Sequence, residues 1–394
     1  MKKALKLLCI FSCLVFLGAT VVAPAYAENI KVGVILPLIG KLAKFGKIEQ
    51  KSFLMAVDEI NAAGGVNGNR IDLIIEDTEG RPVVGRSAIE KLILQDKVVV
   101  VGGGWSSSVT WAAATVAQQR KVPFLVNTAS ADKITEQGWG YIFRINSPVS
   151  EHPRALASFL SKVANVKTAS ILHENTLSGE FGVKKFVELC EKLNIEVVMI
   201  EGYEAGATEL YPFLLKAKEK DPDLVYMNSR PMDASLLMQQ AQMLDFIPKL
   251  YVGNAGGFTL PEFQRNAGEA AEYVYSATLW TPSVLYPGAK EYYDKFAAKY
   301  NTPPGYHGAQ AYAAMYVIAD ALKRAKPLTP KGVRDALAET ELMTVFGPVQ
   351  FVSYGKKTQQ NRLPNYLVQW INGKREIVWP KEVATARYIY PAPK

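Results

Sequence analysis

Residues 98–120 read VVVVGGGWSSSVTWAAATVAQQR and join three kinds of segment in one stretch. Val98–Val101 is uniformly apolar and β-branched, which is typical of a strand that helices cover on both faces. Ser107–Arg120 is expected to be helical, and a loop of glycines, tryptophan and serine connects it to the strand. The stretch therefore predicts a strand–loop–helix unit, the repeating element of a parallel α/β sheet.

The same alternation continues in both directions from this stretch. Within Gly46–Asn61, apolar side chains recur at spacings of four and three, as in a helix with one buried face. Eight apolar runs are expected to be strands, in two series of four: Ile30–Leu36, Ile71–Glu76, Val98–Val101 and Phe124–Val126, then Ala169–His173, Glu196–Ile200, Leu224–Met227 and Leu250–Val252. Regular alternation of strands and helices predicts right-handed crossovers and two doubly wound, Rossmann-like α/β lobes.

The carboxyl-terminal part departs from this alternation. Helices are expected at Tyr286–Tyr300, His307–Ala325 and Pro330–Glu339, and short strands at Gly347–Ser353 and Tyr366–Ile371. No low-complexity linker separates these parts from the rest of the chain. Several crossings between the two lobes would then form a hinge rather than a flexible tether.

The amino-terminal residues have the features of a cleavable secretory signal. Three lysines precede an apolar run, Leu7–Val22, and the small-residue site Ala25-Tyr26-Ala27 follows. A membrane anchor is the alternative, but the run is shorter than the ~20 apolar residues that span a bilayer. We expect residues 1–27 to be a signal peptide, cleaved after Ala27, and the mature protein to be periplasmic.

Composition and charge exclude several classes of protein. Hydrophobic residues make up 49% of the 394 residues and charged residues 21%, which is typical of globular domains and not of disordered chains. The formal charge of +8 falls to +5 without the lysines of the signal. The remaining charges are scattered, with no basic block of the kind that binds phosphates, so no nucleic-acid partner is expected.

Templates for catalysis and for metal binding are missing from the sequence. His152, His173 and His307 show no metal-ligand spacing with each other or with Cys190. Cys190 is the only cysteine beyond the signal, so the mature chain cannot form an internal disulfide. No acid–base pair stands at a diagnostic spacing. We expect no metal, no cofactor and no enzymatic activity.

Two loops that follow neighbouring predicted strands could instead bind an anion. In the first, glycines allow close backbone approach, Ser106 and Ser107 supply hydroxyls, and the following helix supplies unpaired amino-terminal N–H groups. The second, Asn127–Ser130, has a similar composition. Doubly wound sheets bind ligands outside the carboxyl ends of their strands, where both loops lie. Simple helix capping would explain either loop alone, but two in succession favour a carboxylate site.

The chain resembles the branched-chain amino-acid-binding proteins, which are type I periplasmic solute receptors of ATP-driven importers. The resemblance covers essentially the whole mature chain and rests on these segments: Ile30–Pro37 with Gly40 and Gly46, Ala56–Gly68, Ser106–Ser108, Thr135–Gly138, Tyr141–Arg144, Gly179-Glu180, Asp221–Tyr226 and Gln310–Ala314. It implies two α/β lobes joined by three hinge crossings, with the ligand enclosed between them. It also implies permease and ATPase partners in the inner membrane, and we expect the receptor to be a monomer.

Carried over residue by residue, the family's ligand site is only half retained. Ser106 matches the family's serine that grips the ligand's carboxylate, and Thr128 and Ser130 fall at its partners on the next loop. The half that grips the ammonium group is changed. Ala255 stands where the family has a glutamate, and tyrosines of the family are replaced by Arg230, Ser178 and Phe45.

This exchange bears on the class of ligand. A buried ammonium without a carboxylate partner costs several kcal/mol, so the loss of the glutamate disfavours an ordinary amino acid. Arg230, if it faces the cleft, would prefer a carboxylate, a phenolate or a carbonyl. Trp105, Phe45, Tyr306 and His307 could wall a flat aromatic ligand. Alternatively, Arg230 lies in solvent, and Glu151 serves as a displaced ammonium partner.

The sequence thus predicts an importer's receptor for a small carboxylate-bearing ligand, an aromatic or other organic acid being favoured. The first lobe would comprise residues 28–147 and 277–351, and the second 148–276 and 352–394. Three alternatives remain: a receptor for branched-chain or other neutral amino acids, a ligand-sensing module, and an exported hydrolase that uses Ser106.

Overall fold

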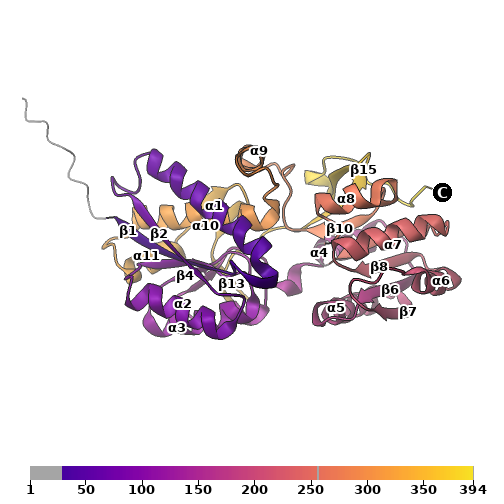
Figure 1. Ribbon diagram of the computed structural model, residues 1–394, viewed down its shortest axis with the longest axis horizontal. Coiled ribbons are helices and arrows are strands. Elements are labelled where there is room, and N and C mark those ends of the chain that lie inside the picture. Colours follow the sequence, from indigo (N-terminus) through magenta and orange to yellow (C-terminus); the bar gives the residue numbers. More distant parts are fainter. Residues whose placement is uncertain (1–28, 255–256, 394) are drawn as a thin grey trace, which may run out of the picture.

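The computed structural model describes residues 29–254 and 257–393, which form two α/β lobes side by side (Figure 1). Each lobe contains a seven-stranded sheet, with the order β13-β14-β5-β4-β3-β1-β2 in the first and β16-β15-β10-β9-β8-β6-β7 in the second. The strands of the first sheet are β1 (Ile30–Leu36), β2 (Ile71–Asp77), β3 (Val100–Gly103), β4 (Phe124–Val126), β5 (Ile142–Arg144), β13 (Val352–Tyr354) and β14 (Lys357–Gln360). Those of the second are β6 (Thr168–Glu174), β7 (Glu196–Tyr203), β8 (Leu224–Asn228), β9 (Leu250–Asn254), β10 (Tyr275–Thr278), β15 (Tyr366–Ile371) and β16 (Lys374–Trp379). The expected class, two doubly wound α/β lobes, is confirmed.

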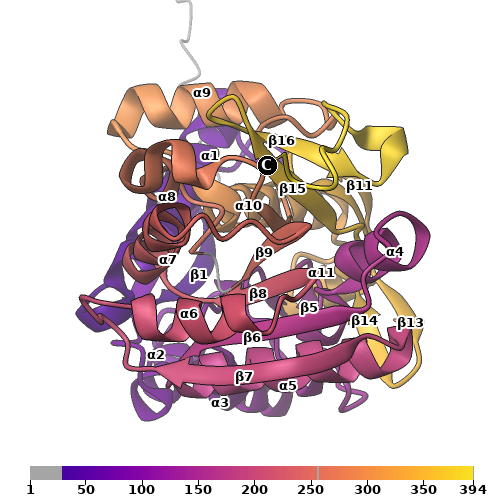
Figure 2. The same cartoon turned by 90° about the vertical axis from the view of Figure 1, so that its right-hand side faces the viewer.

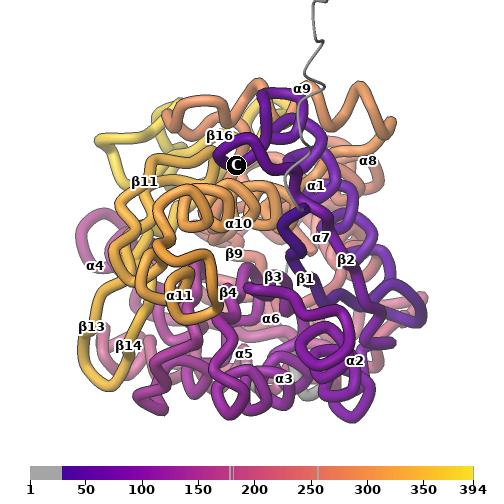
Figure 3. The backbone as a smooth tube through the Cα atoms, turned by 90° about the vertical axis from the view of Figure 1, so that its left-hand side faces the viewer, coloured from indigo at the N-terminus to yellow at the C-terminus, as the bar shows by residue number. Residues whose placement is uncertain are grey.

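Helices cover both faces of each sheet, as Figures 2 and 3 show for the second and the first lobe. In the first lobe, one face packs against α1 (Ala43–Ala62), α9 (Ala289–Tyr300), α10 (Gly305–Arg324) and α11 (Pro330–Ala338), and the other against α2 (Pro82–Leu94) and α3 (Ser107–Arg120). In the second lobe, α4 (Arg154–Lys162) and α5 (Leu177–Leu193) cover one face, and α6 (Tyr211–Glu219), α7 (Pro231–Met243) and α8 (Pro261–Ala267) the other. A small hairpin of β11 (Glu341–Thr344) and β12 (Gly347–Gln350) completes the first lobe.

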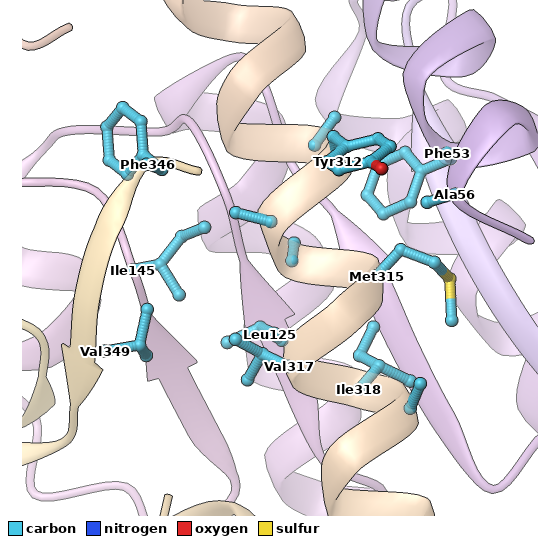
Figure 4. Close-up of a cluster of buried hydrophobic side chains, with 14 of the residues drawn as sticks. Phe53, Ala56, Leu125, Ile145, Tyr312, Met315, Val317, Ile318, Phe346 and Val349 are labelled. Atoms are coloured by element: carbon cyan, nitrogen blue, oxygen red, sulfur yellow. The ribbon is translucent and has the colours of Figure 1, made fainter. Parts of the chain in front are cut away.

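This two-sided burial explains why the strands read as continuous apolar runs. Val34 of β1 packs into the core beneath α1 and α10, whereas its neighbour Ile35 packs into the core beneath α2 and α3. Figure 4 shows the first of these cores, where Phe53 of α1 and Met315 and Ile318 of α10 lie together. Both faces of a central strand are therefore dry, which favours apolar side chains on both.

The second lobe buries the cysteine of the described residues, Cys190. Cys190 of α5 is fully buried in the core formed with α4 and the sheet, and it makes no disulfide. Burial raises the pKa of the Cys190 thiol to about 12. The residue behaves as a small hydrophobic side chain that packs against the sheet.

Three crossings connect the lobes: β5 to α4, β10 to α9, and β14 to β15. The third crossing lies later than expected, because β13 and β14 extend the first sheet, with Gln360 of β14 paired to Arg144 of β5. The assignment of residues 352–360 to the second lobe is therefore wrong. Likewise, β10 belongs wholly to the second sheet, so the second crossing begins after Thr278 rather than at residue 277.

The predicted signal peptide, residues 1–27, lies outside the described residues. Among residues 29–254 and 257–393, no helix is long and apolar enough to cross a membrane.

Gly46 of α1 offers a test of the packing at the start of this helix. A Cβ on Gly46 would lie 1.8 Å from the carbonyl oxygen of Pro37, in the segment after β1. Helix propensity alone favours Gly→Ala by up to about 1 kcal/mol, whereas a backbone clash of this kind costs about 1–3 kcal/mol. We expect Gly46→Ala to lower the free energy of unfolding in urea.

Gly140→Ala is the matched control for this experiment. Its Cβ would first meet a side-chain atom rather than backbone, Arg334 Nη2 at 3.3 Å, and the backbone of Gly140 does not have a positive φ. We expect a change within about 0.5 kcal/mol. A stabilised Gly46→Ala protein would show that α1 does not pack against Pro37 as described.

Candidate functional site

The loop after β3 forms one wall of the candidate site. Gly103 and Gly104 have φ values of +100° and +90°, and a Cβ on Gly103 would lie 2.4 Å from the carbonyl oxygen of Ile35. Only glycine fits this sharp turn from strand to helix. The turn places Ser106 at the N-cap of α3, in extended conformation.

The hydroxyl of Ser106 is not used to cap the helix. It accepts no hydrogen bond from the first turn of α3, and its side-chain contact is with the hydroxyl of Ser108, at 3.2 Å. Ser107, in contrast, accepts a hydrogen bond from the backbone N–H of Ala131, at 3.1 Å, and so ties this loop to the loop after β4. The first N–H groups of α3 and the Ser106 hydroxyl thus remain available to an anion.

An aromatic cluster adjoins Ser106. It consists of Phe45 of α1, Trp105 of the loop, and Tyr306 and His307 of α10. Phe45 stacks on Trp105 with ring centroids 4.9 Å apart, and His307 lies 5.0 Å from Phe45 and 5.8 Å from Trp105. Burial lowers the pKa of His307 to about 3, so its ring is neutral at pH 7. The structure therefore brings together the four aromatic side chains that the sequence analysis singled out.

Trp105 carries a second feature of this wall. Its indole Nε1 is buried and has no hydrogen-bond partner among the described residues. A buried indole N–H usually has an acceptor. A ligand with an oxygen at this point would satisfy it.

In the loop after β4, the polar groups of Ser130 face the site, whereas the hydroxyl of Thr128 is bonded within the core. The hydroxyl and backbone N–H of Ser130 have no hydrogen-bond partner within the described chain, while its carbonyl accepts from the N–H of Val149 in the first crossing. Thr128 is buried, with only 7% of its surface exposed, and its hydroxyl contacts Glu49 and Gln310 at 2.7 and 2.9 Å. Of the two predicted partners of Ser106, only Ser130 thus retains a free hydroxyl.

Glu49, which the sequence analysis missed, is the centre of a buried acid–amide network. The network consists of Glu49, Asn127, Thr128, Asn146 and Gln310, all with at most 7% of their surface exposed. Burial raises the pKa of Glu49 to about 8, although hydrogen bonds from Asn127 and Thr128 oppose the shift. A sequence signal was present, because Glu49 lies four residues before Phe53 on the buried face of α1.

This first wall is held in place by a buried arginine. Arg144, at the end of β5, is fully buried and donates hydrogen bonds to the Gln360 Oε1 at 2.6 Å, the Thr135 Oγ1 at 2.8 Å and the carbonyl oxygen of Ala131 at 2.7 Å. Burial lowers the pKa of Arg144 to about 10, which still leaves it charged at pH 7. Its positive charge therefore lies directly behind the loop that carries Ser130.

The second lobe contributes an arginine that is already paired. Arg230 follows β8, and its Nε donates to Glu174 Oε2 at 2.7 Å while its backbone N–H donates to Glu174 Oε1 at 2.5 Å. Glu174 is buried, whereas 63% of the Arg230 side chain is exposed. The guanidinium group is thus anchored through Nε and leaves its terminal nitrogens toward solvent.

The remaining predicted residues are Ser178, Ala255 and Glu151. Ser178 lies in the first turn of α5, and Ala255 lies outside the described residues. Glu151, the possible displaced ammonium partner, sits in the first crossing with its Oε2 3.1 Å from Arg154 Nη2. Its charge is therefore already compensated.

One ion pair shows how the two lobes face each other. Lys44 Nζ lies 3.3 Å from Glu262 Oε1. Lys44 precedes Phe45 of the aromatic cluster, and Glu262 is in the first turn of α8, which follows β9. The carboxyl-end loops of the two sheets therefore lie opposite each other. An exposed pair of this kind contributes about 0–1 kcal/mol, so it holds the lobes only weakly.

The fold and its site geometry can be compared with known proteins. Residues 29–375 match a family model described as "Periplasmic binding protein". A Leu/Ile/Val-binding protein homologue of Brucella melitensis is 27% identical over 389 residues, with 95% of this chain and 96% of the relative covered.

Solved structures agree with this match. The branched-chain amino acid transporter substrate-binding protein LivJ of Streptococcus pneumoniae, in complex with isoleucine, is 28% identical, with a TM-score of 0.75 over 92% of this chain and all of that one. A solute-binding protein of Rhodopseudomonas palustris in complex with 3,4-dihydroxybenzoic acid is 20% identical, with a TM-score of 0.74 over 92% of this chain and 98% of the other, and shares the fold.

The family match extends over most of the chain, and the relatives align with it along nearly their whole length. The expectation of a receptor without enzymatic activity is confirmed by this match. The chain belongs to the periplasmic binding proteins, and it is a substrate-binding protein of an ABC transporter.

Proposed function

We propose that this receptor captures a small aromatic or other organic acid between its two lobes and delivers it to the transporter. The observation that carries the proposal is the wall of the first lobe, where the aromatic cluster adjoins the Ser106 hydroxyl, which does not cap α3, the Ser130 hydroxyl and the amino terminus of α3. A flat apolar body would stack on the cluster, and its carboxylate would accept hydrogen bonds from the loop groups.

Charge also favours an acid over a zwitterion. In the part of the chain that the structure describes, the acids around this site already have partners. Glu174 pairs with Arg230, Glu151 pairs with Arg154, and Glu49 lies in a buried hydrogen-bond network. An ammonium group would have to displace one of these partners. The terminal nitrogens of Arg230 can donate hydrogen bonds to a second polar group of the ligand.

Export through the amino-terminal signal and a monomeric receptor are part of the same proposal. Lobe closure about the three crossings would bring Arg230 toward Ser106, and a ligand that contacts both lobes would favour the closed state.

A neutral amino acid is the second candidate ligand. The Leu/Ile/Val-binding names of the relatives and the isoleucine complex of LivJ favour it. Glu174 could then exchange Arg230 for the ligand's ammonium group.

A thermal-shift screen separates the two candidates. We expect benzoate or 3,4-dihydroxybenzoate to raise the melting temperature, because a ligand at 100 times its Kd stabilises by about 2.7 kcal/mol. Leucine and isoleucine should have little effect at the same concentrations. Strong stabilisation by leucine or isoleucine alone would overturn the organic-acid proposal.

Removal of the Ser106 hydroxyl tests the anion site. Ser106→Ala should weaken carboxylate binding by about 1–3 kcal/mol, measured by isothermal titration calorimetry, because a hydrogen bond to a charged acceptor is lost. Ser87→Ala is the matched control, since the Ser87 hydroxyl bonds to the Val83 carbonyl of its own exposed helix. Equal affinity of the two variants would mean that Ser106 does not contact the ligand.

Arg230→Met tests the second lobe. We expect a loss of affinity for 3,4-dihydroxybenzoate of about 1–3 kcal/mol, because a charge-assisted hydrogen bond from the guanidinium group to a ring hydroxyl is lost. Arg86→Met, which removes a similarly exposed arginine from α2, should leave the affinity unchanged. If the amino-acid alternative holds, Arg230→Met would instead release Glu174 and improve leucine binding in the same titration.

A further inference from the structure

The acid–amide network contains a proton that the hydrogen-bond geometry can locate. Thr128 Oγ1 lies 2.7 Å from Glu49 Oε1 and 2.9 Å from Gln310 Oε1. The Gln310 oxygen is fixed in this position because its Nε2 donates to Asn146 Oδ1, at 2.7 Å. A threonine hydroxyl has a single hydrogen to donate, so it cannot donate to both oxygens.

A proton on Glu49 resolves the conflict. Glu49 Oε1 then donates to Thr128, and Thr128 donates to Gln310. The second lone pair of the Thr128 hydroxyl accepts from Asn127 Nδ2, at 2.9 Å, and the same amide donates its other hydrogen to Glu49 Oε2, at 2.9 Å. Each contact between these four side chains then has one donor and one acceptor, and Asn127 Oδ1 is left as a buried acceptor without a partner.

The surroundings of Glu49 also favour the neutral acid. Its titratable neighbours from other elements are Tyr292 of α9 and Tyr306 of α10, and His307 of α10 contacts Phe45, one helical turn before Glu49. Burial keeps both tyrosines and the histidine uncharged at neutral pH. No ion pair is formed by Glu49 with the lysines and arginines of the described chain, and its surface is fully buried.

We propose that Glu49 is a proton-carrying positioning residue of the ligand site, and that the site takes a carboxylate only while Glu49 holds its proton. The protonated acid fixes Thr128 and, through it, the loop that ends in Ser130. Loss of the proton would remove the donor and place a negative charge beneath the groups that receive the ligand's carboxylate. The proposal rests on the proposed function, since it assumes an anionic ligand at Ser106 and Ser130.

The first test needs no ligand. A carboxyl group that stays protonated in the folded state but ionises in the unfolded chain makes the folding equilibrium constant fall about tenfold per pH unit. For Glu49, the pH range over which folding becomes less favourable runs from about pH 4.5, its ordinary pKa, to about pH 8, its pKa in the folded protein. The contribution of this group to the free energy of unfolding is fully present below pH 4.5 and is lost as the pH rises toward 8.

Glu49→Gln removes the titration and keeps the size and the hydrogen-bonding groups. The ratio of its folding equilibrium constant to that of wild type, from urea unfolding between pH 5 and pH 9, should rise about tenfold per pH unit and level off above pH 8. Glu59→Gln is the control on the same helix, because hydrogen bonds from Tyr312, Tyr316 and Lys295 lower the pKa of Glu59. Its ratio should stay constant above pH 5, and a constant ratio for Glu49→Gln would overturn the proposal.

The second test uses benzoate as the probe. Between pH 6.5 and pH 9, the wild-type affinity should fall on the order of tenfold, since two like charges at this range repel in a partly buried site, and the affinity of Glu49→Gln should stay flat. Parallel pH profiles for the two proteins would overturn the role of the proton in binding. If benzoate binds neither protein at any pH, the proposed function fails, and the ligand-free titration still decides whether Glu49 carries the proton.

If Glu49→Gln does not fold, wild-type protein decides the same point. With ¹³C-labelled glutamate, one carboxyl resonance should titrate near pH 8 rather than near 4.5. The absence of such a resonance would overturn the proposal.

Discussion

The geometry of the receptor depends on one buried charge, the guanidinium group of Arg144. It lies at the end of β5, where the chain first leaves the first lobe, and binds Gln360 at the end of β14, where the chain leaves this lobe again. The same group binds the carbonyl oxygens of Ala129 and Ala131 on either side of Ser130. A buried charge with neutral oxygen partners is costly unless every donor is satisfied. The first and third crossings and the anion loop therefore share one fixed anchor.

Around this anchor, the candidate ligand site is divided between the two lobes. The aromatic cluster, the α3 amino terminus and the acid–amide network belong to the first lobe; the network is buried and the aromatic cluster is half-buried. Arg230 and Glu174 belong to the second lobe, and the lobes meet at the exposed Lys44–Glu262 pair. A site built in this way can fix the orientation of a ligand on one wall before the other wall closes over it.

The sequence predicted the fold well where a segment is buried on both sides. The eight apolar runs are strands in the structure. Helices on both faces of a sheet shield such uniformly apolar segments from water. The prediction failed for β13 and β14, whose mixed polar residues carry no pattern and which join the first sheet through pairing with the distant β5. Pairing between segments so far apart in sequence depends on tertiary structure, which local periodicity cannot reveal.

The candidate site divides in the same way. The strand–loop–helix pattern and the family resemblance predicted Phe45, Trp105, Ser106 and His307 as site residues, and the structure places them next to one another. Glu174 and Glu49 were missed because their roles depend on partners that are remote in sequence, Arg230 in one case and Thr128 and Gln310 in the other. Thr128 was assigned to the ligand, but the neighbouring buried acid occupies its hydroxyl.

The burial of Cys190 has a consequence for the redox chemistry of the protein. Thiol–disulfide exchange proceeds through the thiolate, and a pKa of about 12 leaves almost no thiolate at neutral pH. The sulfur is also shielded from other molecules by the α4–α5 layer. The thiol of Cys190 therefore resists oxidation and the formation of mixed disulfides as long as the second lobe stays folded.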